Sequence, residues 1–298
     1  MAGQIIVYTL VTGGVYALLA SGFSLIFGVA RVLNMAHTAF YMLAAYGLFY
    51  LVSAVMGIEM SFIPAMIIVV VVVSLLGVLS YKLLINRIRE HHAAVLLVTM
   101  ALAMAIEQIL VLVFHEDIRS ITFLVPGTVN ILGMTISNQY LLTLGTVAVI
   151  IIFIQLLLTK TKMGIAIRAV ANDTEVASLM GMSASRILMM TMGIATFLAA
   201  VAGVVMAPLI TMYPSMWGSP LMTMMVIVVL GGLGSIKGSI IGAFIIAFVA
   251  GVCVLDPLSL FGGGGAYLNS SFILLAMVIV LIVRPGGLFG VMFEEERL

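Results

Sequence analysis

Charge is what this sequence has least of. Of its 298 residues only 8% are Asp, Glu, Lys or Arg, whereas 64% are hydrophobic. Soluble domains carry roughly 25% charged residues, so a soluble fold of this composition would lack the polar atoms needed to cover its surface. The net charge of +1 argues against nucleic acid as a partner. We therefore expect the chain to reside in a lipid bilayer.

Cysteine and the common catalytic motifs are also nearly absent. The lone Cys253 excludes a disulfide within the chain and a cysteine-based zinc site. His91 and His92 are adjacent and make a poor metal pair. The sequence contains no GxSxG, HExxH, Walker lysine loop or CxxC motif. We expect neither enzymatic activity nor a metal or cofactor on this chain.

Long apolar stretches fill most of the chain. A membrane helix needs about 20 predominantly apolar residues, and only helices or closed barrels can span lipid without unpaired backbone groups. Suitable stretches run approximately over 5–29, 38–56, 62–84, 93–114, 139–159, 187–210, 220–233, 239–255 and 270–283. The 220–233 stretch is short and would suit a half-helix or re-entrant piece. We predict an all-α polytopic membrane bundle of eight or nine transmembrane helices, forming a single domain over 1–298.

Connections rich in Lys and Arg alternate along the chain with connections that are poor in them. The basic residues cluster after the third, fifth, seventh and last stretches, at Lys82, Arg87, Arg89, Lys160, Lys162, Arg168, Arg186, Lys237 and Arg284. The intervening loops hold Glu59, Glu116, Asp117, a single Arg119 and Asp256. Because short cytoplasmic loops carry the excess of Lys and Arg, we expect the clusters and the C-terminus to face the cytoplasm of a bacterial or archaeal plasma membrane. Nine spans would then place the N-terminus outside.

Small residues are expected to hold such a bundle together. Gly234, Gly238 and Gly242 recur every four residues. This spacing would form a stripe on one helix face and let a neighbouring helix approach closely. We assign the three glycines to helix packing.

Polar residues at membrane depth are functional candidates, because burying them in lipid costs free energy. Asn34, His37 and Tyr41 follow the first stretch, and Glu107 and Gln108 lie in the fourth. We take all five as candidates for a substrate path. His37 could instead be an interfacial hydrogen-bonding residue. Glu107 could bind a substrate ammonium, relay protons or join two helices by a hydrogen bond.

The longest polar connection is the loop 160–186. Asn172 is predicted to cap a short helix over Thr174–Met180, with Glu175 completing a capping box and Gly181 ending the helix. Asp173 and Glu175 would be exposed, and Val176, Leu179 and Met180 would form the other face. Because an isolated helix this short is unstable in water, either the bundle or a partner must pack against it.

This loop resembles the cytoplasmic coupling loop of ABC importer permeases, where an E-A-A-x-x-x-G core contacts the ATPase. Glu175-Val176-Ala177 and Gly181 match that core, with valine in place of the first alanine. Segments 22–46, 107–120, 163–187, 229–244 and 284–290 are similar, in the same order, to branched-chain amino acid permeases of the LivH type.

The resemblance implies partners that the chain itself does not reveal. It implies pairing with a second, LivM-like permease subunit, two ATP-binding cassette subunits that bind ATP and Mg, and an extracytoplasmic solute-binding protein. It makes Glu175 and Gly181 part of the element that couples to the ATPases. We assign Asp173, Ala177 and Arg186 to the same coupling role. Asn34 and His37 match the family's N-F-A-H segment and Gln108 matches a recurrent glutamine, whereas Glu107 matches no family position.

The expected function is therefore ATP-driven import of branched-chain amino acids, with this chain forming half of the translocation path. Two alternatives stay open. One is a proton-coupled secondary transporter that uses Glu107 or His37 as a proton relay. The other is an ABC permease for another small solute, such as urea or amides, since no residue in the sequence decides between solutes.

Overall fold

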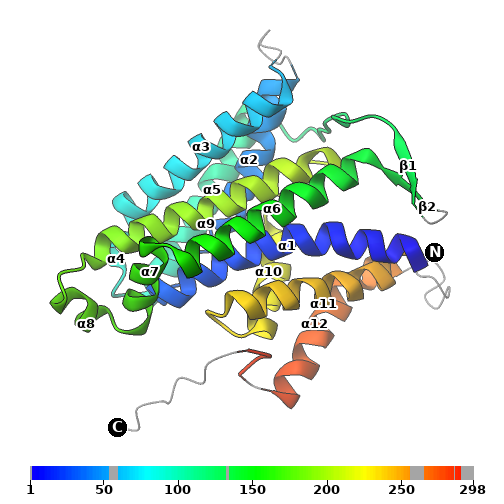
Figure 1. The fold of residues 1–298 in the computed structure, drawn as a ribbon. Coiled ribbons are helices and arrows are strands. Elements are labelled where there is room, and N and C mark those ends of the chain that lie inside the picture. The colour runs from blue at the N-terminus through cyan, green and yellow to red at the C-terminus, as the bar shows by residue number, and fades with distance from the viewer. Residues whose placement is uncertain (1, 54–59, 132–133, 256–264, 285, 290–298) are drawn as a thin grey trace.

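The computed structural model of the protein describes residues 2–53, 60–131, 134–255, 265–284 and 286–289 (Figure 1). The loop residues Glu59 and Asp256, and Pro285 and Gly290 of the 284–290 segment, lie outside this part of the chain. The main elements are, in chain order, the helices α1 (Ala2–Ala30), α2 (His37–Val52), α3 (Phe62–Ser80), α4 (Asn86–Ile88), α5 (His92–Phe114), α6 (Asn138–Lys160), α7 (Lys162–Asn172), α8 (Thr174–Leu179), α9 (Ala184–Met206), α10 (Gly218–Gly231), α11 (Ile236–Leu255) and α12 (Gly265–Val283).

Each of the nine apolar stretches coincides with a helix. Within the described residues, six helices are long and apolar enough to cross a membrane, namely α1, α3 with its extension to Ile88, α5, α6, α9 with its extension to Leu209, and α11. The helices α2, α10 and the 269–283 part of α12 are shorter. The predicted polytopic helical bundle is thus confirmed, while the number of eight or nine spans stays a prediction.

Four short elements that are not α-helices were not predicted. A π-helix, η1 (Tyr81–Ile85), interrupts the end of α3, and a 3₁₀ turn, η2 (Ala207–Leu209), follows α9. Strands β1 (Thr128–Ile131) and β2 (Met134–Ser137) form an antiparallel hairpin between α5 and α6. The hairpin departs from a strictly all-α fold, but it lies beyond the helical bundle beside the N-terminal end of α1 (Figure 1).

The two ends of the bundle differ in charge. The elements α4, α7 and α8 lie at one end and the β-hairpin at the other (Figure 1). The first end, which we call the cationic end, also holds the C-terminal end of α1 and the turn before α11, because these share cavities with α7. Its basic residues are Arg31, Lys82, Arg87, Arg89, Lys160, Lys162, Arg168, Arg186, Lys237 and Arg284. Arg119 lies at the opposite end, where its backbone pairs with Met212.

Burial separates inner from outer helices. In its most apolar window α1 is 83% buried, against 28% for the α3 and α5 spans and 22% for α6. Most of the short α2 is also buried, and it packs between α9, α3 and α5. The inner helices α1, α2 and α9 thus form the core, while α3, α5 and α6 expose apolar side chains as lipid-facing helices do.

Glycines let neighbouring helices touch at their backbones. A Cβ atom added to Gly203 of α9 would collide with the carbonyl oxygen of Tyr41 in α2, and one added to Gly231 of α10 would collide with Gly238 of α11. Gly242 lies one turn further along α11, where an added Cβ would be 2.9 Å from the carbonyl oxygen of Ile227.

Gly234 does not share the stripe predicted for it. It precedes α11, adopts a positive φ of 82° and lies against Gly28 of α1. The prediction of one continuous helical stripe was wrong at this position, because the α10–α11 turn needs a left-handed residue there.

The close contact at Gly203 predicts that a larger side chain there lowers the stability of the bundle. Gly203→Ala should lower bundle stability by about 1–3 kcal/mol, because the new methyl group forces α2 and α9 apart. Gly145→Ala in α6 is the matched control, since an added Cβ there meets nothing within 4 Å. Thermal unfolding in detergent can be followed by labelling the single, buried Cys253. Equal unfolding midpoints for the two variants would contradict the predicted packing.

Candidate functional site

The loop between α6 and α9 contains two helices, where one was predicted. The Thr161 side chain accepts a hydrogen bond from the Gly164 amide at 3.1 Å and thereby caps α7. Gly164 contacts the carbonyl oxygens of Leu157 and Leu158, where a side chain would not fit. Helix α7 therefore folds back tightly against the end of α6. The signal for this missed helix was the helical spacing of Ile167 and Val170, which are buried in the structure.

Helix α8 begins at Thr174 as predicted and ends at Leu179, one residue before the predicted end, but its cap is a different residue. Its N-cap is Asp173, whose Oδ1 accepts hydrogen bonds from the amides of Glu175 at 2.9 Å and Val176 at 3.0 Å. Asn172 is instead the last residue of α7. The predicted Asn172 cap and its capping box with Glu175 are therefore wrong, because Asp173 supplies the same kind of oxygen at a position that lets α7 extend further.

Gly181 ends α8 as predicted. It adopts a φ of 84°, a conformation that costs other residues free energy. Its amide donates to Ser178 O at 3.0 Å, and the Met182 amide donates to Ala177 O at 3.1 Å. This pair of bonds is the Schellman motif that closes many helices. Both ends of the six-residue α8 are thus fixed by hydrogen bonds.

The part of the chain that the structure describes does not cover the apolar face of α8. Ala177 is buried, but Val176 is 55%, Leu179 85% and Met180 77% exposed. The structure excludes packing of these three side chains on the described part of the bundle. Helix α8 therefore presents an apolar surface next to the acidic Asp173 and Glu175, which are also exposed.

The residues assigned to coupling lie on two neighbouring helices. Asp173, Glu175, Ala177 and Gly181 belong to α8 and its caps, and Arg186 is exposed in the first turn of α9. The beginning of α9 is tied to α4 by a hydrogen bond from Ser185 Oγ to Asn86 Oδ1 at 3.2 Å. Helix α8 itself contacts both α7 and α9.

The polar residues that follow α1, Asn34, His37 and Tyr41, are buried and contact other residues of the bundle. Asn34 Oδ1 accepts a hydrogen bond from the Ala36 amide at 3.1 Å. His37 Nε2 lies 3.1 Å from the Leu19 carbonyl oxygen, and its ring packs edge-on against Phe23. His37 is fully buried and forms this hydrogen bond inside the bundle. Tyr41 is also buried, at the close contact with Gly203.

Glu107 joins two helices. Its Oε2 accepts a hydrogen bond of 2.7 Å from the indole nitrogen of Trp217, which immediately precedes α10. Gln108 points elsewhere and is exposed on the outside of α5. The structure thus separates the two neighbours, as expected for adjacent residues on a helix. The role of Trp217 was not recognised in the sequence, because 110 residues separate it from Glu107.

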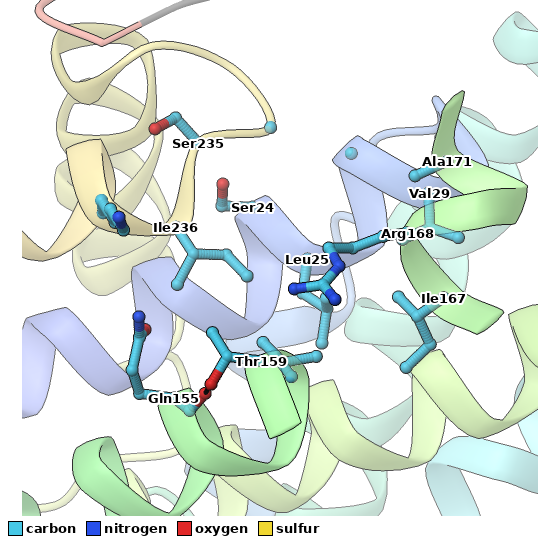
Figure 2. Close-up of a pocket in the computed structure, with 14 residues that line it drawn as sticks. Ser24, Leu25, Val29, Gln155, Thr159, Ile167, Arg168, Ala171, Ser235 and Ile236 are labelled. Atoms are coloured by element: carbon cyan, nitrogen blue, oxygen red, sulfur yellow. Dashed lines mark hydrogen bonds between the residues drawn. The ribbon is translucent and has the colours of Figure 1, made fainter. Parts of the chain in front are cut away.

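A cavity of about 350 Å³ opens at the cationic end. Figure 2 shows its walls, which come from α1, α6, α7 and the turn into α11. Its polar lining residues are Ser24, Gln155, Thr159, Arg168, Ser235 and Lys237. None of the substrate-path candidates lines this cavity, and sequence analysis did not identify it.

Together, fold and loop define a class: a multi-pass α-helical membrane protein with a capped, exposed helix at its cationic end. The family model described as "Branched-chain amino acid transport system / permease component" matches residues 5–284. The chain therefore belongs to this family of transport permeases, which are not enzymes.

Individual relatives agree with this assignment. The chain is 29% identical to the high-affinity branched-chain amino acid transport system permease protein LivH of Salmonella typhimurium, over 93% of this chain and 92% of the relative. It is 24% identical to BraD of Pseudomonas aeruginosa, over 96% and 95% of the two chains. A probable LivH of Methanocaldococcus jannaschii is 26% identical, over 94% and 90%. No solved structure matches the chain significantly.

The caps of α8 yield a local prediction. Asp173→Ala should destabilise α8 by about 1 kcal/mol, because two amides lose their acceptor, and should speed their hydrogen exchange about fivefold. Asp173→Asn keeps an acceptor oxygen and serves as the control. Exchange measured by mass spectrometry over residues 170–183 would distinguish them. Identical rates in all three proteins would show that the cap does not hold α8.

Proposed function

We propose that the chain is one of two membrane subunits of an ATP-driven ABC importer for branched-chain amino acids, and that α8 contacts an ATPase subunit. The family match and the relatives' names support the transport role. The observation that carries the coupling role is the exposed apolar face of α8, formed by Val176, Leu179 and Met180.

A protein partner suits this face better than lipid does. A six-residue helix is unstable alone, but the Asp173 cap and the Gly181 motif stabilise the helical conformation of α8. Docking a preformed helix costs less conformational entropy than docking a flexible loop. The acidic side chains of Asp173 and Glu175 disfavour an anionic membrane surface. An ATPase groove would cover the apolar residues and leave the carboxylates at its rim.

The charge distribution supports a cytoplasmic position for α8. All basic residues that the structure describes, except Arg119, lie at the cationic end with α8, and Arg119 is paired with Asp117 at 2.8 Å. By the positive-inside rule this end faces the cytoplasm, where ATP is available. Leu288 and Phe289 lie at the same end, since the Leu288 amide donates to Leu230 O at 2.8 Å and the Phe289 amide donates to Gly231 O at 3.0 Å. This position supports the proposal of a cytoplasmic C-terminus.

The proposed mechanism is alternating access. Closure of two ATPase subunits, which bind ATP and Mg, would displace α8 together with α7 and α9. Helix α9 packs along α1, α2 and α3, so its tilt would move the core of the bundle. A second, LivM-like permease subunit would form the other half of the path, and an extracytoplasmic binding protein would deliver the solute. Leucine-like amino acids are the proposed solutes, with urea or amides as alternatives.

The α8 face can be tested by charge insertion. Leu179→Glu should weaken association with co-produced ATPase subunits about tenfold to a hundredfold, because a buried apolar contact becomes a buried charge. Ile165→Glu is the matched control, since Ile165 of α7 is also an exposed apolar residue, 56% exposed against 85% for Leu179. Pull-down in detergent and leucine uptake would report the effect. Equal loss in both variants, or in neither, would exclude α8 as the specific contact.

Glu107 distinguishes this proposal from proton-coupled transport. Glu107→Gln keeps an oxygen that can accept from Trp217 but cannot exchange a proton, so leucine uptake should stay within about twofold of wild type. Glu107→Leu leaves the indole N–H unpaired and should cost about 1–3 kcal/mol of stability. Uptake should also persist with an uncoupler while ATP lasts. Loss of uptake in stably folded Glu107→Gln would favour the proton relay.

A further inference from the structure

The cavity at the cationic end combines positive charge with apolar walls. Arg168 of α7 and Lys237 of α11 are its two charged lining residues, and no Asp or Glu lines it. Figure 2 shows the Arg168 guanidinium reaching from α7 toward Leu25 of α1 in the cavity wall. Neither cation forms an ion pair with the residues that the structure describes. The cavity is therefore suited to an anion.

The hydroxyl groups of Ser24 and Ser235 also make the cavity suitable for an anion. Ser24 is fully buried in α1 and lines the cavity, yet its Oγ has no hydrogen-bond partner among the described residues. A buried hydroxyl without a partner costs free energy, so an acceptor in the cavity would relieve it. Ser235 Oγ accepts from the Gly238 amide at 3.2 Å, which leaves its proton free for donation. Thr159 is already engaged, since it donates to Gln155 O at 2.6 Å.

The surroundings of the cavity indicate where the anion comes from. Its volume of about 350 Å³ falls in the usual range of small-molecule sites. Leu25, Val29 and Leu158 supply apolar walls. On the neighbouring turns of α6, Ile152, Phe153 and Leu156 are more than half exposed, as on a lipid-facing surface. An acyl chain could lie along α6 while a polar group enters the cavity.

We propose that this cavity binds the phosphate of an anionic phospholipid headgroup, held by Arg168 and Lys237 with Ser24 and Ser235 as hydroxyl donors. Basic pockets between membrane helices are suited to such headgroups. The bound headgroup would bridge α1, α6, α7 and α11. Helix α7 leads directly through Asp173 into α8. The bound headgroup would therefore also restrict movement of the beginning of α8.

The proposal can be tested on the purified protein by native mass spectrometry in detergent. The probes are phosphatidylglycerol, phosphatidylcholine and inorganic phosphate. Wild type should bind phosphatidylglycerol at least about tenfold more tightly than phosphatidylcholine. The double variant Arg168→Gln/Lys237→Gln should lose this preference. Lys160→Gln/Lys162→Gln is the matched control, because it removes the same charge at the same end from residues that do not line the cavity, and it should change binding less than about twofold.

Ser24→Ala keeps every charge and should weaken phosphatidylglycerol binding about threefold to tenfold. This variant separates the cavity from general surface attraction and guards against misfolding of the double variant. Equal losses in the two double variants, or unchanged binding in both, would overturn the proposal. Saturable binding of inorganic phosphate that displaces phosphatidylglycerol would identify a free anion as the occupant and overturn the assignment to lipid.

Discussion

Close contact between helix backbones is the constraint on which the rest of this structure depends. In lipid, packing apolar side chains against one another gives little hydrophobic free energy, because the lipid tails are equally apolar. Helices therefore associate through tight packing and hydrogen bonds. Gly203 brings α9 against the Tyr41 carbonyl of α2, and Gly77 brings α3 against Thr196 of α9. Helix α9 is thereby fixed to two neighbours at once. Since α9 begins shortly after α8, this rigid core extends to the surface where we propose that force arrives.

Polar groups inside the bundle serve the same packing. Thr99 Oγ1 accepts from the Met35 amide at 3.1 Å, and Asn34 accepts from Ala36, so both support the turn between α1 and α2. Glu107 and Trp217 join α5 to the beginning of α10. Each of these bonds satisfies a group that lipid could not. Membrane depth alone therefore does not make a polar residue a substrate ligand in this chain.

The sequence determined some features better than others, for physical reasons. Apolar stretches locate helices because lipid exposure requires an unbroken run, and Gly181 could be placed because only a left-handed residue ends α8 in this way. The choice between Asn172 and Asp173 as cap could not be made, since both offer the same oxygen and tertiary packing of α7 decides. The pairing of Glu107 with Trp217, and the convergence of Ser24, Arg168 and Lys237, depend on helix packing that no local pattern encodes.

The two caps of α8 connect its local chemistry to its proposed task. A flexible loop would deform when a partner displaces it and would not pass the displacement on. A helix capped by Asp173 and Gly181 moves as a rigid unit. Ala177 anchors that unit to the bundle through its buried methyl group, and the exposed Leu179 and Met180 remain available to a partner. Helix α8 together with its C-cap Met180 thus has an anchored side and a free side. This division is what a short element needs if it is to pass a displacement from a soluble subunit into membrane helices.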